Sequence, residues 1–186
     1  QDIDEDQYEL VSLLVGRSLE ESDLKLSILA VGDDDQNIYR FRGANVGFIK
    51  RFHDDYKASV SYLVENYRSS ANIINASNLL IAENQDRMKT DRPIIVNKAR
   101  EMLPKGGNWQ VSDHLAKGRV QVLQVRNKVE QAAAVLAELK RLKGISDQFS
   151  LANTAILARE WRELDLLRTY FEEEDIPVNL NWGKSS

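Results

Sequence analysis

The chain has 186 residues, of which 42% are hydrophobic and 29% charged, and a formal net charge of −4. These values are ordinary for a globular protein and allow one large domain or parts of two. The chain has no cysteine and only two histidines, so we expect no metal ligands within it. No run of about 18 apolar residues occurs, and no basic and then apolar leader, which predicts no membrane partner and a cytoplasmic location. The slightly acidic charge means that any contact with DNA must come from a local cationic patch.

Apolar periodicity divides the chain into alternating helices and strands. In chain order, the first predicted elements are a helix at 6–16, a strand at 25–31, a helix at 44–52, a strand at 61–64 and a helix at 69–81. The later ones are a short strand at 94–96 within an irregular connection (84–116), a strand at 119–125, a helix at 128–142, a strand at 154–158, a helix at 161–171 and a strand at 176–180. This alternation favours βαβ units, and hence an α/β fold with a parallel sheet and flanking helices.

The most informative stretch directly follows the first predicted strand and combines a glycine, three carboxylates and a glutamine. It reads Val31-Gly-Asp-Asp-Asp-Gln-Asn-Ile-Tyr-Arg-Phe-Arg-Gly-Ala44. Open α/β sheets hold their ligands at the C-terminal ends of their strands, so Gln36 is placed to read a terminal phosphate. Further along, Tyr39, Phe41 and Arg42 offer rings and a cation to a nucleic acid.

A second motif, Glu65-Asn-Tyr-Arg-Ser-Ser70, follows the strand predicted at 61–64. Together the two motifs resemble the third and fourth motifs of the UvrD/Rep-like superfamily 1 DNA helicases. Gln1-Asp2 followed by Gln7 also looks like the tail of that family's second motif, Asp-Glu-x-Gln-Asp. The resemblance implies two RecA-like (P-loop NTPase-type) domains with ATP between them. Residues 1–57 would form the C-terminal part of the first domain, and residues 58–186 the N-terminal part of the second.

The phosphate-binding loop G-x-x-x-x-G-K-[ST] does not occur in the chain. The resemblance therefore implies an internal fragment that is inactive by itself, from a parent that binds ATP and Mg²⁺ through upstream residues. That parent would couple ATP hydrolysis to 3′-to-5′ movement on single-stranded DNA and to duplex unwinding, in DNA repair, replication or recombination. Two alternatives are a helicase–nuclease with the same motor and a degenerate module that binds DNA or a partner without catalysis. The sequence does not indicate an oligomeric state.

The resemblance also assigns roles to individual residues. Gln36 resembles the glutamine that senses the γ-phosphate of ATP, and Arg68 resembles the arginine finger that neutralises charge on the transferred phosphoryl group. Both are expected to be catalytic and to contact the nucleotide, whose adenine would stack on Tyr67. In the same way, Tyr39, Phe41 and Arg42 resemble the residues that meet single-stranded DNA.

Each of these residues has a purely structural alternative. Gln36 could cap its loop, Arg68 could pair with Glu65 at the surface, and Tyr67 could belong to the core. Tyr39 could pack under its loop, and Arg42 could form a salt bridge with one of the carboxylates. Of those carboxylates, Asp33 could position water or magnesium, or cap the turn after the strand. Asp34 and Asp35 are expected to be solvated loop residues.

Overall fold

The computed structural model of the chain describes residues 3–20, 25–37, 45–84, 87–147 and 149–179. It divides into two compact units, one drawn from residues 1–68 and 74–98 and the other from residues 69–73 and 99–186. The domain boundary predicted after residue 57 stays a prediction. Among the described residues, no helix is long and apolar enough to cross a membrane.

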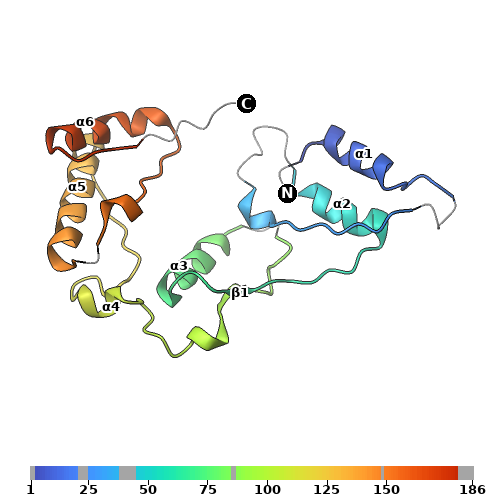
Figure 1. The fold of residues 1–186 in the computed structure, drawn as a ribbon, viewed down its shortest axis with the longest axis horizontal. Coiled ribbons are helices and arrows are strands. Elements are labelled where there is room, and N and C mark those ends of the chain that lie inside the picture. The colour runs from blue at the N-terminus through green and yellow to red at the C-terminus, as the bar shows by residue number, and fades with distance from the viewer. Residues whose placement is uncertain (1–2, 21–24, 38–44, 85–86, 148, 180–186) are drawn as a thin grey trace. The chain divides into compact units, whose positions relative to one another are not determined.

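Most of the regular structure is helical, with one small parallel sheet (Figure 1). The α-helices are α1 (Glu5–Leu14), α2 (Gly47–Tyr56), α3 (Ala71–Ile81), α4 (Trp109–Ser112), α5 (Lys128–Ile145) and α6 (Asp165–Glu173). The 3₁₀ turns are η2 (Asp34–Gln36), η4 (Lys98–Arg100), η5 (Leu151–Asn153) and η6 (Trp161–Glu163). The strands are β1 (Glu65–Asn66) and β2 (Ile95–Val96), which pair in parallel. This mixture of helices with a parallel sheet confirms the α/β expectation at a coarse level, whereas the RecA-like fold stays a prediction.

In the first unit, α1 and α2 lie against each other (Figure 1). The ring of Tyr8 stacks on that of Phe48, with centroids 5.2 Å apart. The Tyr8 hydroxyl donates a hydrogen bond to Asp55 at 2.9 Å, and that of Tyr56 donates to Ser12 at 3.1 Å. Each buried hydroxyl thus has a partner on the other helix, which fixes how the two helices pack.

The parallel sheet of the first unit is anchored to α3 by a single amide side chain. Asn78 accepts a hydrogen bond from the backbone N–H of Ile94 at 3.2 Å and donates one to its carbonyl at 2.7 Å. At the next residue, the N–H of Ile95 donates to the carbonyl of Val64 at 2.9 Å. At the C-terminal end of β1, where the second motif continues, the N–H of Asn97 donates to the carbonyl of Asn66 at 3.1 Å.

The core of the second unit lies between α5 and α6, which run side by side (Figure 1). Its buried members are Ala132, Leu136, Leu139, Leu167 and Phe171. Those from α5 recur at helical spacing and lie on the apolar face that the sequence predicts. α5 begins at Asn127, whose side chain accepts a hydrogen bond from the N–H of Glu130 at 2.9 Å, as expected of an N-cap.

Several predicted strands are wrong as stated. Residues 25–31, 119–125, 154–158 and 176–179 form no ladder within the described part of the chain, and in place of the strand predicted at 61–64 the structure has β1, which begins at the next residue, Glu65. A strand exists only where its N–H and C=O groups meet a neighbouring strand, and apolar composition alone does not supply that partner. Several large side chains of these runs are open to solvent, with Leu29 89%, Val122 93% and Leu157 91% exposed, whereas Ile156 and Ile176 pack against the core of the second unit.

Candidate functional site

The candidate site has two parts, both in the first unit: the turn that carries Gln36 and the turn that carries Tyr67 and Arg68. Gln36 is the last residue of η2 and is exposed. Its side-chain nitrogen donates a hydrogen bond to Asp33 Oδ2 at 2.6 Å. Because a carboxylate only accepts hydrogen bonds, this contact turns the amide nitrogen toward Asp33 and points the amide oxygen elsewhere.

Asp33 also holds the backbone of the same turn. It precedes η2 in an extended conformation, and its Oδ1 accepts a hydrogen bond from the N–H of Asp35 at 3.1 Å. Capping of the turn, which the sequence left as one of two roles for Asp33, is therefore present in the structure. Both oxygens of one carboxylate are used to shape the turn that presents Gln36.

The expectation that Asp34 and Asp35 are solvated is wrong. Their side chains are only 6% and 14% exposed. Asp35 receives two hydrogen bonds from the guanidinium of Arg87, each of 2.8 Å, and Asp34 accepts one from the backbone N–H of Met88 at 2.6 Å. Lys89 binds Asp33 and approaches Asp35 to 3.4 Å. Segments more than fifty residues apart therefore share one buried group of charges.

The charges in this group favour one another's ionised forms. The bidentate bond from Arg87 lowers the pKa of Asp35 against the opposing effect of burial. Burial lowers the pKa of Lys89, but its bonds to Asp33 and Asp35 outweigh that effect and leave the pKa raised. The charged forms of Asp35 and Lys89 are thus both favoured near neutral pH.

The second part of the site lies at the C-terminal end of β1. Tyr67 is 69% exposed, so the alternative of a core tyrosine is wrong. Its hydroxyl donates a hydrogen bond to Glu65 at 3.0 Å, and the same Glu65 oxygen accepts a second bond from the amide of Asn97 at 2.6 Å. The bonds from Asn97 and Tyr67 lower the pKa of Glu65, and the bond to Glu65 raises the pKa of Tyr67. The ring is therefore held by its polar tip while its faces remain available for stacking.

Arg68 follows at the same turn and is exposed. Its backbone N–H donates a hydrogen bond to Asn66 Oδ1 at 2.9 Å, a local side-chain bond that shapes the turn after the strand. The structure thus places an exposed aromatic ring and an exposed guanidinium next to each other at the C-terminal end of a parallel strand. In α/β folds, that end of the sheet is where ligands bind.

The expected DNA-binding residues and the start of the chain cannot be placed in the structure. Tyr39, Phe41 and Arg42, the expected DNA contacts, lie outside the described residues, as do Gln1 and Asp2. Conversely, three residues that the sequence did not single out now belong to the site: Asn97, Arg87 and Lys89. The sequence shows that each of these residues carries a charge or an amide, but it does not show the partner. Asn97 lies 32 residues from Glu65, Arg87 lies 52 from Asp35 and Lys89 lies 56 from Asp33, and only the fold brings each pair together.

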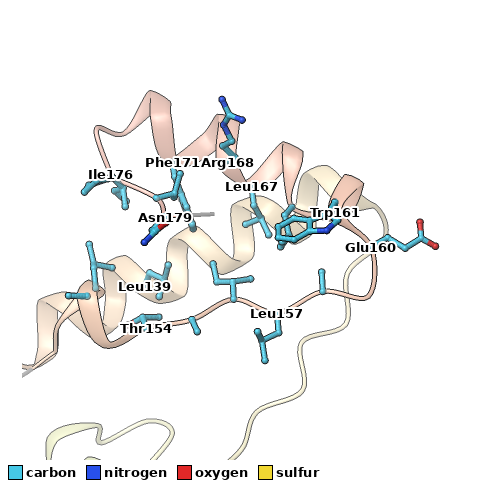
Figure 2. Close-up of a pocket in the computed structure, with 18 of the residues that line it drawn as sticks. Leu139, Thr154, Leu157, Glu160, Trp161, Leu167, Arg168, Phe171, Ile176 and Asn179 are labelled. Atoms are coloured by element: carbon cyan, nitrogen blue, oxygen red, sulfur yellow. The ribbon is translucent and has the colours of Figure 1, made fainter. Parts of the chain in front are cut away.

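A cavity of about 840 Å³ lies elsewhere, in the second unit between α5, α6 and residues 154–158 (Figure 2). Leu139, Leu167 and Phe171 line it together with Glu160 and Arg168, whose charged ends point outward in Figure 2. None of the predicted site residues contributes to its lining. Most of its lining residues are apolar and none belongs to either sequence motif, so we place the candidate site at the two turns rather than in this cavity.

Comparison with known proteins identifies similar sequences along nearly the whole chain. The family model described as the UvrD/REP helicase N-terminal domain matches residues 1–57, and the UvrD-like helicase C-terminal domain matches residues 61–183. Together they contain both turns of the candidate site.

Individual relatives agree with the family models. The chain is 30% identical to the ATP-dependent DNA helicase Rep of Salmonella typhimurium over 187 residues, and 29% identical to the ATP-dependent DNA helicase PcrA of Staphylococcus epidermidis over 185 residues. These alignments cover 100% and 99% of this chain, but only 24% and 22% of the relatives. DNA helicase II of Haemophilus influenzae is 43% identical over 88 residues, which are 47% of this chain and 11% of the relative. The chain therefore spans less than a quarter of the length of these relatives.

Proposed function

The chain belongs to the UvrD/Rep-like family of DNA helicases, and from this we propose that the protein couples ATP hydrolysis to movement along single-stranded DNA and to unwinding of the duplex. Support comes from similarity to two family models and to proteins named as ATP-dependent DNA helicases. The 3′-to-5′ direction of movement, and a place in DNA repair, replication or recombination, belong to the same proposal.

One structural observation carries the proposal: Tyr67 and Arg68 are exposed side by side at the C-terminal end of β1. In the proposed motor, the adenine of ATP stacks on the ring of Tyr67. The guanidinium of Arg68 reaches the γ-phosphoryl oxygens, where it neutralises the charge that builds up during transfer. Glu65 and Asn97 hold the ring in place through the Tyr67 hydroxyl. The backbone of the turn that also carries Arg68 is thereby held in place.

Gln36 has the complementary role at the γ-phosphate. A neutral amide can contact phosphate or the attacking water without adding charge of its own. Its nitrogen faces Asp33, so its oxygen is the end available to accept a hydrogen bond from that water. Magnesium, bound through residues upstream of this chain, would neutralise the phosphate oxygens. Tyr39, Phe41 and Arg42 would grip the bases by stacking and charge.

The test is ATP turnover by the complete protein that carries these residues, measured with and without single-stranded DNA. Wild type should show turnover that DNA stimulates, and Arg68→Ala should reduce kcat by about 10³-fold or more. Arg168→Ala is the matched control, because it removes an exposed arginine that pairs with Glu172 one turn further along α6. Wild type without turnover would favour a non-catalytic binding module. Turnover insensitive to Arg68→Ala would remove Arg68 from the mechanism.

A further inference from the structure

Two basic residues outside both sequence motifs are built into the turn that presents Gln36. We call Asp33, Asp34, Asp35, Arg87 and Lys89 the charge clamp. Within it, Arg87 binds Asp35 through two parallel hydrogen bonds, and Lys89 binds Asp33. Arg87 and Lys89 are only 9% and 12% exposed, unlike ordinary surface cations.

From this arrangement we propose that Arg87 and Lys89 are positioning residues for Gln36, an inference that rests on the proposed ATP hydrolysis. They do not touch the reacting atoms themselves. They hold the aspartates of the turn, and Asp33 in turn holds the amide of Gln36. The geometry at the γ-phosphate therefore depends on a segment that lies more than fifty residues further along the chain.

The two cations of the clamp bind different aspartates and so hold different residues of the turn. Asp33 uses one oxygen for Gln36 and the other for Lys89, as well as for the N–H of Asp35. Without Lys89, Asp33 keeps its hydrogen bonds within the turn but loses this ion pair to the segment that carries Arg87 and Lys89. Arg87 fixes the neighbouring residue of the turn in a planar, two-bond geometry that a point charge does not reproduce.

The clamp also connects parts of the chain that match different family models. Asp33, Asp34 and Asp35 lie within residues 1–57, and Arg87 and Lys89 lie within residues 61–183. Tyr67 is held separately, by Glu65 and Asn97. Loosening the clamp should therefore disturb the hydrolytic step more than nucleotide binding, which distinguishes a positioning role from a general loss of structure.

A metal site is the rival explanation for three adjacent carboxylates, since their oxygens lie within 4.8 Å of one another. The contacts argue against it, because the ammonium of Lys89 binds Asp33 and lies 3.4 Å from Asp35 and 4.0 Å from Asp34. Two cations of the protein itself, Lys89 and Arg87, are thus already paired with these carboxylates. The aspartates are thus better explained as the acidic half of an ion-pair cluster than as ligands.

The experiment compares Arg87→Gln and Lys89→Gln with Gln36→Ala in the complete protein, using steady-state ATP turnover with single-stranded DNA. Misplacing a catalytic group by about 1 Å can cost about 10²-fold, so each variant should lower kcat by about 10- to 100-fold and change KM for ATP far less. Lys89→Arg, which keeps the charge, should recover part of the loss. Arg92→Gln is the control, because Arg92 lies in the same segment but stacks over Tyr62 instead of entering the clamp.

A double variant tests the clamp even if a single substitution disturbs folding. Exchanging the partners in Asp35→Arg with Arg87→Asp rebuilds one ion pair with reversed charges, and circular dichroism shows whether each variant is folded. Higher kcat in the exchanged pair than in folded Arg87→Asp supports the clamp. Wild-type kcat in Arg87→Gln and Lys89→Gln, with Gln36→Ala impaired, would overturn the clamp and leave the proposed function standing. No turnover by wild type would overturn the proposed function, and the clamp's catalytic role with it.

Discussion

Truncating Leu139 on α5 tests whether the core lies where the structure places it. Leu139 is 8% exposed and belongs to the cluster between α5 and α6. Leucine to alanine removes three carbon groups worth about 0.8 kcal/mol each, and a cavity term brings such changes to about 2–5 kcal/mol. Because Leu139 also lines the cavity of Figure 2, the space that it leaves is partly open, and we expect the low end, about 2–3 kcal/mol.

The matched control is the same substitution at Leu157, which is 91% exposed and belongs to a run that the sequence predicts as a buried strand. Leu157→Ala should change stability by less than about 0.5 kcal/mol. Urea and thermal unfolding measure both variants, and Leu139→Ala should lower Tm by about 5–10 °C for a chain of this size. Equal losses in the two variants would show that residues 154–158 are buried after all, and would refute the assignment of the core.

Three further predictions follow from named contacts. Tyr67→Ala should raise KM for ATP in steady-state turnover. Tyr67→Phe keeps the ring and loses only the hydroxyl bond to Glu65, so it should raise KM less. Equal KM values in wild type and both variants would exclude stacking. Burial and the hydrogen bond to Asp55 raise the pKa of Tyr8 from 10.0 to about 12. Stability from this group is therefore complete below pH 10 and is lost as the pH rises through 12, which unfolding at high pH should show for wild type but not for Tyr8→Phe. Asp4→Ala removes the capping box of α1 and should cost about 1 kcal/mol in urea unfolding, whereas an unchanged midpoint would mean that this cap contributes nothing.

Helices were predictable because their signals are local. The apolar face of α5, including Ala132 and Leu136, is visible as a repeat along the sequence and is buried in the structure. Strands were less predictable, since Leu29 and Val122 sit in apolar runs that look like buried strands but form no ladder within the described residues. An apolar run reveals that a segment favours an extended, buried conformation. Whether it forms a strand depends on a partner strand elsewhere in the chain.

The same contrast applies to the site. The position of Tyr67 just after a strand follows from the motif itself, and the structure confirms that the ring is exposed. By contrast, nothing near Asp35 in the sequence reveals that Arg87 will neutralise it, so a buried ion pair was mistaken for a solvated carboxylate. Interactions across more than fifty residues come from the fold and not from local pattern.

The most direct test of the proposed motor is strand separation by the complete protein, on a DNA duplex that carries a single-stranded 3′ tail. The account predicts unwinding that requires ATP, that is much weaker with a 5′ tail, and that Arg68→Ala abolishes while Arg168→Ala does not. No unwinding by wild type, or unwinding that is unchanged in Arg68→Ala, would contradict it.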